Sequence, residues 1–329
     1  MFTMTVSIDP RISLLEPATL AFLKRLEAQG GPPLYTLTPT DARNILVSVQ
    51  RSSPVTPLPA DVKDLTIPGG PTGQVSLRIV RPQGVSGTLP GIIYCHGGGW
   101  ILGDKETHDR LIREIANGVQ ATVVFVDYAR SPEARYPVAI EQAYTALIWA
   151  AEQGNTAGID PAQLAVCGDS VGGNMATILT MLAKERHGPK ITFQVLCYPV
   201  TDAGMNTESY RRYGDGSLWL SSEAMKWFWD AYAPDVALRK NYKLSPLQAS
   251  LEQLRELPPA LIIVDENDPL RDEGEAYAHK LQEAGVRVTA VRYMGTIHDF
   301  LLLNPLAETP ATRGAIALTI AALRTAFSR

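Results

Sequence analysis

Short apolar runs alternate with stretches of helical periodicity along most of this chain, from about residue 75 to its C-terminal end. The apolar runs are nearly continuous, which is typical of strands buried on both faces of a mostly parallel sheet. This alternation predicts an α/β fold in which helices cover both faces of a central sheet. The expected strands are Val75–Val80, Gly91–Tyr94, Thr122–Val126, Leu164–Val166, Phe193–Tyr198, Leu261–Val264 and Val288–Arg292. The expected helices are Thr107–Asn117, Pro137–Gln153, Asn174–Arg186, Gly274–Glu283 and Ala311–Phe327.

Two stretches depart from this alternation. Near the N-terminus, apolar residues recur at helical spacing from Leu14 to Leu26, and Thr38-Pro39-Thr40-Asp41 is typical of the start of a second helix. Between Pro199 and Ser245 lies an insertion rich in aromatic residues. We expect most of its rings to form a packed core and the rest to line a pocket. These residues are Tyr210, Tyr213, Trp219, Trp227, Phe228, Trp229 and Tyr232.

The most specific motif is Gly168–Gly172, which reads Gly-Asp-Ser-Val-Gly. It follows an apolar strand and opens a helix, and a serine at such a strand-to-helix turn is typical of the nucleophile elbow of hydrolases. The turn is so tight that side chains at the two glycine positions would clash with the main chain. The pattern therefore predicts that Ser170 is a nucleophile.

A nucleophilic serine also needs oxyanion donors, a base and an acid. Three successive glycines, Gly97–Gly99, follow the strand at Gly91–Tyr94, and their N–H groups can converge on one point without interference from side chains. Asp268 and His298 follow two later strands, which gives the chain order serine, acid, histidine found in α/β-hydrolases. All these groups are expected at the carboxyl ends of the strands, where α/β sheets bind their ligands.

These motifs make the chain similar to the hormone-sensitive lipase-like family of α/β-hydrolases, which includes many microbial carboxylesterases. The resemblance extends from about Pro90 to Leu306 and is weaker in the N-terminal part. The matching segments are His96–Trp100, Leu102-Gly103-Asp104, Asp127-Tyr128, Ser131-Pro132-Glu133, Gly168–Gly173, Asp268–Gly274 and His298.

The resemblance implies a role for each site residue. The nucleophile is Ser170, the base is His298 and the acid is Asp268, while His96 is structural. The N–H groups of Gly98, Gly99 and Val171 form the oxyanion hole.

The resemblance also implies an α/β-hydrolase core with a helical cap over the active site. The expected division is residues 1–50 as the N-terminal part of the cap, 51–200 as core, 201–244 as the cap insertion, and 245–329 as core with the acid and base loops.

Three residues differ from the family pattern. Val171 replaces the usual alanine; its N–H stays available, but its methyl groups crowd the acyl site. Gln142 stands where aspartate is frequent, and Asp299 follows the histidine where glycine is usual. A carboxylate of Asp299 close to His298 raises the pKa of the imidazole, whereas one that points to solvent or pairs with an arginine is largely screened.

Other residues are alternatives for the same roles. Asp265 and Glu266 share the loop of the predicted acid, while Asp272 is expected to cap the next helix. Of the five histidines, only His298 follows a strand beyond the acid, and His108 is expected in a polar loop. Cys167 is the alternative nucleophile, but its place in the strand before the elbow predicts a small core residue.

Composition narrows the function classes. The chain has 329 residues, 45% hydrophobic and 19% charged, and its net charge of −4 offers no electrostatic footprint for nucleic acid. No apolar run is long enough to span a bilayer, and Met1–Pro10 lacks the basic start and apolar core of a signal peptide. The three cysteines argue against a disulfide framework and favour a cytoplasmic location.

We therefore expect a serine carboxylesterase that hydrolyses esters of small to medium acyl length through an acyl-enzyme. An amidase or lactonase on the same triad is the alternative, and a non-catalytic small-molecule receptor on this fold is disfavoured because all three triad residues are present. No metal-ligand spacing and no phosphate-binding loop occurs, so we expect no metal and no other cofactor. The expected partner is a small-molecule ester, without nucleic acid or membrane insertion, and a homodimer is left open.

Overall fold

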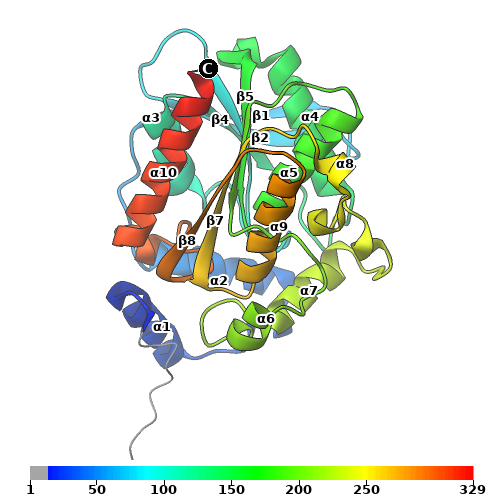
Figure 1. Ribbon diagram of the computed structural model, residues 1–329. Helices are drawn as coiled ribbons and strands as arrows, with labels where there is room; N and C mark the ends of the chain where they lie inside the picture. Colours follow the sequence, from blue (N-terminus) through cyan, green and yellow to red (C-terminus); the bar gives the residue numbers. More distant parts are fainter. Residues whose placement is uncertain (1–13, 329) are drawn as a thin grey trace, which may run out of the picture.

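The computed structural model describes residues 14–328, and a single eight-stranded sheet runs through its centre (Figure 1). The strand order is β1-β2-β4-β3-β5-β6-β7-β8. The pairs β1/β2 and β2/β4 are antiparallel, and all other neighbours are parallel. The expected α/β-hydrolase fold is confirmed. The strands are β1 (Ala60–Pro68), β2 (Gln74–Pro82), β3 (Leu89–Cys95), β4 (Thr122–Asp127), β5 (Ile159–Asp169), β6 (Phe193–Cys197), β7 (Ala260–Asn267) and β8 (Val288–Ile297).

All seven expected strands are present, and β1 is an additional one. It escaped the sequence analysis because it is an edge strand whose side chains are mostly exposed, so it carries no apolar run. The central strands β3 and β4 are almost entirely buried, as their continuous apolar sequences predicted. Met1–Pro10, where we expected no signal peptide, lies outside the described residues.

Helices cover both faces of the sheet. On one side α3 packs against α10, and on the other lie α4, α5 and α9 (Figure 1). The five expected helices are confirmed with small shifts of their ends, and the short helices α6, α7 and α8 are additional. The helices are α1 (Pro17–Gln29), α2 (Pro39–Arg51), α3 (Asp109–Val119), α4 (Val138–Glu152), α5 (Val171–Glu185), α6 (Glu208–Tyr213), α7 (Ser222–Tyr232), α8 (Leu251–Leu254), α9 (Arg271–Glu283) and α10 (Pro310–Phe327).

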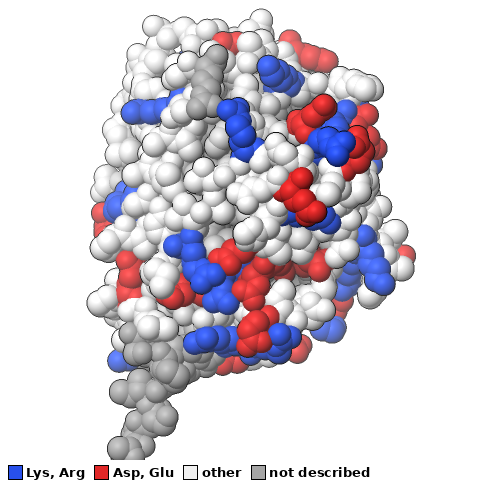
Figure 2. Space-filling view, viewed as in Figure 1, with Lys and Arg blue, Asp and Glu red and all other residues white. Residues whose placement is uncertain are grey.

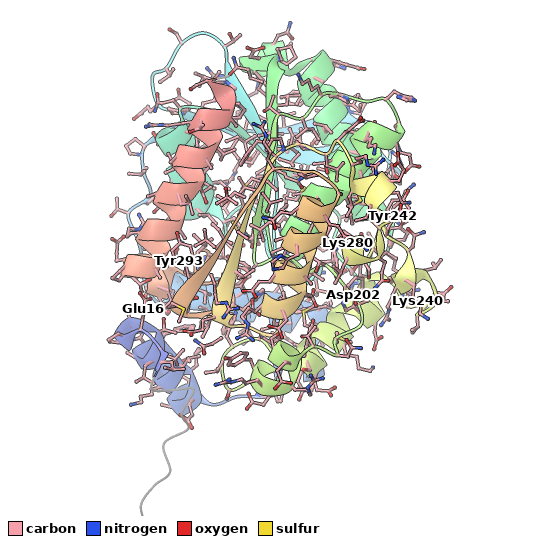
Figure 3. All side chains as sticks on the ribbon, in the orientation of Figure 1. Glu16, Asp202, Lys240, Tyr242, Lys280 and Tyr293 are labelled. Carbon is pink, nitrogen blue, oxygen red and sulfur yellow. The ribbon has the colours of Figure 1, made fainter. Side chains whose placement is uncertain are left out.

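Two segments from distant parts of the sequence gather at the end of the sheet where β7 and β8 end. They are α1 with α2 and the insertion that carries α6 and α7 (Figure 1). Thr38 caps α2 as expected, because its side chain accepts a hydrogen bond from the N–H of Asp41. The start of α1 is tied to β8: the N–H of Glu16 donates to the carbonyl of Gly295 at 3.0 Å, and Glu16 lies at the same corner as Tyr293 in Figure 3.

Acidic and basic side chains are interspersed on the face shown in Figure 2, so neither sign dominates there. In the described part of the chain, none of the helices combines the length and apolar character needed to cross a bilayer. Gln142, one of the departures from the family pattern, is structural. Its amide oxygen accepts from the N–H of Ala129, and its amide nitrogen donates to the hydroxyl of Thr72.

Candidate active site

Ser170 stands at the turn between β5 and α5, with φ of 54° and ψ of −120°. A positive φ at a residue other than glycine is strained, and such strain is usually found at functional positions. The neighbouring main chain holds it: the N–H of Ser170 donates to the carbonyl of Cys197 at 2.8 Å. A Cβ atom at Gly168 would overlap the carbonyl of Gly172, and one at Gly172 would overlap the carbonyl of Cys95. Close packing of main chain therefore explains both glycines of the motif.

His298 joins the serine to a carboxylate. Its Nε2 lies 3.0 Å from Oγ of Ser170, and its Nδ1 lies 2.8 Å from Oδ2 of Asp268. Because a carboxylate only accepts hydrogen bonds, Nδ1 carries a proton, and Nε2 of the neutral ring is free to accept one from the serine. The other oxygen of Asp268 accepts from the N–H of Leu270 at 3.0 Å. The three side chains are almost completely buried. The structure thus brings together the three residues that the sequence singled out, in a geometry suited to nucleophilic attack.

The charges around His298 shift its titration. Burial opposes protonation of the imidazole, but the carboxylates of Asp268 and Asp299 outweigh burial and raise the pKa of His298 to about 9.

Asp299 lies against the imidazole instead of pointing to solvent or pairing with an arginine. Its Oδ1 is 3.5 Å from Nε2 of His298, and its Oδ2 accepts from the indole N–H of Trp219 at 2.9 Å. Its φ is 67°, which explains why glycine suits this position and why aspartate, one of the residues most tolerant of this conformation, can replace it. The alternative prediction, that the carboxylate of Asp299 points to solvent or pairs with an arginine and is largely screened, is therefore wrong.

The glycine-rich turn after β3 presents N–H groups that have no acceptor within the described residues 14–328. These are the N–H groups of Gly98 and Gly99, at φ of 102° and 63°, and a third comes from Val171 at the start of α5. A peptide group is planar and joins the carbonyl of one residue to the N–H of the next. The partner of the Gly97 carbonyl therefore sets the direction of the Gly98 N–H, and the partner of the Gly98 carbonyl sets that of the Gly99 N–H. The carbonyl of Gly97 lies 2.8 Å from Nδ1 of His96, and the carbonyl of Gly98 accepts from the N–H of Leu102 at 2.7 Å.

His96 therefore orients the turn. Because the carbonyl of Gly97 only accepts, Nδ1 of His96 carries the proton. Burial lowers the pKa of His96 to about 3, so the ring is a neutral donor throughout the physiological range.

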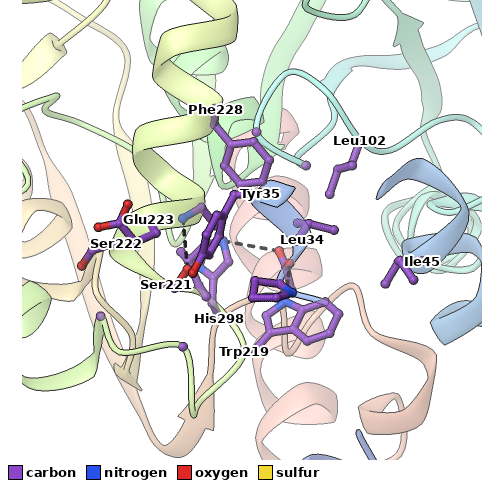
Figure 4. A pocket seen from close by; sticks show the side chains of 18 of the residues that line it. Leu34, Tyr35, Ile45, Leu102, Trp219, Ser221, Ser222, Glu223, Phe228 and His298 are labelled. Carbon is purple, nitrogen blue, oxygen red and sulfur yellow. Dashed lines mark hydrogen bonds and ion pairs between the residues drawn. The ribbon is translucent and has the colours of Figure 1, made fainter. Parts of the chain in front are cut away.

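A cavity of about 480 Å³ contains the side chains of Ser170, His298 and Asp299 in its wall (Figure 4). Of the seven aromatic residues of the insertion, Trp219 and Phe228 line it, and the other five lie outside its lining. A Cβ atom at Gly99 would overlap the ring of Phe228, so the glycine turn and α7 are in close contact. The N-terminal segment and the core add further apolar side chains to the wall, among them Leu34, Tyr35, Ile45, Leu46 and Leu102.

Within residues 14–328, none of the alternative acids makes the hydrogen bond to His298 that Asp268 makes. Asp265 is buried close to Asp268 and His298, and burial together with the charge of Asp268 raises the pKa of Asp265 well above its ordinary value. Glu266 accepts from the N–H of Gly295 at 2.7 Å. Asp272 does not cap α9: the helix begins at Arg271, and Asp272 lies in its first turn, where it accepts from the N–H of Ser209.

Three ligand atoms of Asp265, Asp268 and His298 lie within 4.8 Å of one another, close enough to hold a metal ion. An ion there would replace the hydrogen bond that orients the imidazole. The same atoms of Asp268 and His298 make the 2.8 Å hydrogen bond described above.

Sequence reasoning missed a buried polar cluster behind the elbow. His108, expected in a polar loop, is fully buried, with Nε2 at 3.4 Å from Oδ2 of Asp169. Burial opposes protonation of His108, but the Asp169 carboxylate outweighs it and raises the pKa of the imidazole. The hydroxyl of Tyr94 donates to the other oxygen of Asp169 at 2.7 Å. The only available signal was the position of Asp169 inside the elbow motif. Cys167 is buried and free, as expected of a core residue.

Comparisons with known proteins identify a family and several relatives of this chain. Residues 92–302 match the alpha/beta hydrolase fold family. Ethyl acetate hydrolase of Pseudomonas putida is 36% identical over 305 residues, which cover 89% of this chain and 94% of that protein. Carboxylic ester hydrolase LipN of Mycobacterium tuberculosis is 42% identical over 276 residues, 82% of this chain and 71% of that protein. The crystal structure of a thermostable esterase from Pseudomonas putida aligns with a TM-score of 0.94 and 48% identity, covering 98% of this chain and 99% of that one.

Proposed function

This chain belongs to the hormone-sensitive lipase-like family of α/β-hydrolases and is a carboxylic ester hydrolase, and we propose that Ser170, His298 and Asp268 carry out its reaction. The observation that supports this proposal most directly is the pair of contacts made by one imidazole, 3.0 Å to the serine and 2.8 Å to the carboxylate.

In the first half of the reaction, Oγ of Ser170 attacks the ester carbonyl carbon while Nε2 of His298 takes the hydroxyl proton. Asp268 holds the imidazole in the required tautomer and stabilises its cation. The negative charge on the former carbonyl oxygen is bound by the N–H groups of Gly98, Gly99 and Val171, which form the proposed oxyanion hole. Collapse of this intermediate breaks the bond to the alcohol, which leaves with the proton from His298.

In the second half, a water molecule gives a proton to Nε2 of His298 and attacks the acyl-enzyme carbonyl. The oxyanion donors act again, and the second intermediate releases the carboxylic acid. Ser170 then recovers its proton from His298, so the enzyme returns to its starting state.

The substrates that we propose are esters of small to medium acyl length. A cavity of about 480 Å³ with aromatic and aliphatic walls offers room for a compact substrate and little for a long lipid chain. We also propose that residues 1–50 and 201–244 act as the cap over a core formed by 51–200 and 245–329. A cytoplasmic location is supported by three free, buried cysteines.

Covalent labelling tests the nucleophile. A p-nitrophenyl phosphonate should release one equivalent of nitrophenol per chain and add its mass to the peptide that contains Ser170. The Ser170→Ala variant should take up none. Labelling of Cys167 or of another serine would contradict the assignment.

Matched substrates test the reaction class. An ester, an amide and a lactone with the same acyl group should be compared by kcat/KM, and the ester should be preferred. A higher value for the amide or lactone would favour the alternative function on the same triad.

A further inference from the structure

Arg43 of α2 binds two loops beside the active site at once. Its Nε donates to the carbonyl of Ile101 at 2.8 Å, and its Nη2 donates to the carbonyl of Ser131 at 3.0 Å. The guanidinium also forms a two-point ion pair with Glu133, at 2.9 and 2.7 Å. The side chain of Arg43 is only 18% exposed, whereas that of Glu133 is 61% exposed. The two carbonyl bonds are therefore the better shielded part of this arrangement.

One of these carbonyls, that of Ile101, belongs to the turn that presents the proposed oxyanion donors. The carbonyl of Gly98 accepts from the N–H groups of Ile101 and Leu102 at 3.1 and 2.7 Å, so Ile101 closes the turn. A direct hydrogen bond also links this turn to the second loop that Arg43 binds: the N–H of Ser131 donates to the carbonyl of Trp100 at 2.8 Å. The direction of the Gly99 N–H depends on the Gly98 carbonyl, and hence on where Ile101 is held.

Gln50, near the other end of α2, binds the loop that follows the proposed base. Its amide nitrogen donates to the carbonyl of Leu302 at 3.0 Å, and its amide oxygen accepts from the N–H of Asn304 at 2.8 Å. The amide of Asn304 donates in return to the carbonyl of Gln50 at 3.1 Å. Leu302 is tied to the active site, because its N–H donates to the carbonyl of Asp299 at 2.8 Å.

Arg43 and Gln50 are seven residues apart, which places them on one face of α2 about two turns from each other. We propose that these two side chains make α2 a positioning element, which holds the oxyanion turn and the base loop at a fixed separation. This inference rests on the oxyanion donors assigned above. Neither residue touches the reacting atoms, so both act through the loops that they bind. A small displacement of these loops costs catalysis more than it costs substrate binding.

Arg43→Met removes all the donors and keeps much of the aliphatic stem. We expect its kcat to fall by at least about tenfold, with KM changed by less than about threefold, since transition-state geometry is what suffers. Affinity for an alkyl trifluoromethyl ketone should fall in the same proportion as kcat/KM, because the Ser170 adduct of this ketone places an oxyanion in the hole. Rates are to be normalised to active enzyme by phosphonate titration.

Three further variants separate positioning from folding. Glu133→Gln removes the ion pair and leaves both carbonyl bonds, so it should keep kcat within about twofold. Arg43→Lys keeps the charge but cannot reach both carbonyls, so its kcat should lie between those of the Met variant and the unchanged enzyme. Arg292→Met is the matched control, because Arg292 of β8 forms a comparable two-point ion pair with Glu275 of α9. It should leave kcat unchanged.

The inference is overturned if Arg43→Met keeps kcat within twofold in an enzyme whose Ser170→Ala variant is inactive. It is also overturned if kcat/KM falls while ketone affinity stays constant, or if Glu133→Gln is as damaging as Arg43→Met. An active Ser170→Ala variant would instead refute the proposed catalytic site, so the two failures are distinguishable.

Discussion

Replacement of Asp299 should shift the pH dependence of catalysis. Asp299→Asn removes the charge and keeps an acceptor for the indole N–H of Trp219, whereas Asp299→Gly removes both and suits the φ of 67°. The proposed base, His298, must be neutral to accept the serine proton, so kcat/KM rises with pH through the pKa of its imidazole. The carboxylates of Asp268 and Asp299 raise that pKa from 6.5 to about 9. Loss of the second carboxylate should therefore move the acid limb to lower pH.

The size of the shift follows from the separation of the two side chains. Oδ1 of Asp299 lies 3.5 Å from Nε2 of His298. Unit charges at that distance attract each other by about 1.2 kcal/mol at the dielectric constant of water and about 4.7 kcal/mol at an effective constant of 20. At 1.36 kcal/mol for each pKa unit, these limits correspond to shifts of about 0.9 and 3.5. The side chain of Asp299 is only 13% exposed and so is mostly shielded from solvent, and we expect a shift of at least about one unit, between these limits.

The assay is a pH series of kcat/KM for a soluble ester, with the unchanged enzyme and both variants at low ionic strength. The acid limbs of Asp299→Asn and Asp299→Gly should move together, because they lose the same charge. Glu223→Gln serves as a control, since Glu223 is an exposed carboxylate in the lining of the same cavity and should have a much smaller effect. An acid limb that stays in place or moves upward in Asp299→Asn would refute the coupling. A shift in the Gly variant alone would attribute the effect to Trp219 rather than to charge.

Three other predictions concern the triad, the substrate and the oxyanion turn. Ser170→Ala and His298→Ala should each lower ester turnover by at least about a thousandfold with the fold intact, as judged by circular dichroism, and retention of a tenth of the activity would contradict the triad. Across p-nitrophenyl esters, activity should peak between about two and eight acyl carbons, with each methylene adding up to about 0.8 kcal/mol until the cavity is full. Val171→Ala should shift the optimum toward bulkier acyl groups, and a preference for long-chain triglyceride emulsions would refute this. Gly99→Ala should lower kcat/KM by about a hundredfold, because its Cβ would overlap the ring of Phe228 at a strained φ. Phe228→Ala should recover part of that loss, and equal rates for the single and double variants would exclude the clash.

The sequence predicted the sheet well because burial on two faces leaves a continuous apolar run, as in β3 and β4. It missed β1 because an exposed edge strand leaves no such run. It also assigned no helix to α7, although the buried residues of that helix recur at helical spacing. The residues proposed for catalysis could be found because local turn chemistry and chain order mark them.

Partners that depend on tertiary contacts were beyond sequence reasoning. His108 sits among polar neighbours in the sequence, yet the fold buries it against Asp169, 61 residues away. Asp299 meets Trp219 across 80 residues, so only the structure decides between the two readings of its charge. In the sequence alone, Arg43 and Gln50 are ordinary polar residues of an amphipathic helix, because the loops that they bind are distant in the chain.

The two segments that wall the cavity differ in what they permit when the enzyme is diversified. The insertion that carries α6 and α7 contacts the acid loop, the base loop and the glycine turn at separate points, through Ser209, Trp219 and Phe228. Segments from related chains exchanged there should leave the chemistry intact only where these contacts are kept. In the N-terminal segment the proposed anchors are two side chains of one helix, Arg43 and Gln50 of α2. Chimeras that replace α2 should stay active only when the donor supplies both side chains at the same spacing. Both walls of the cavity are therefore tied to the loops proposed for catalysis, one at several separate points and the other through a single helix.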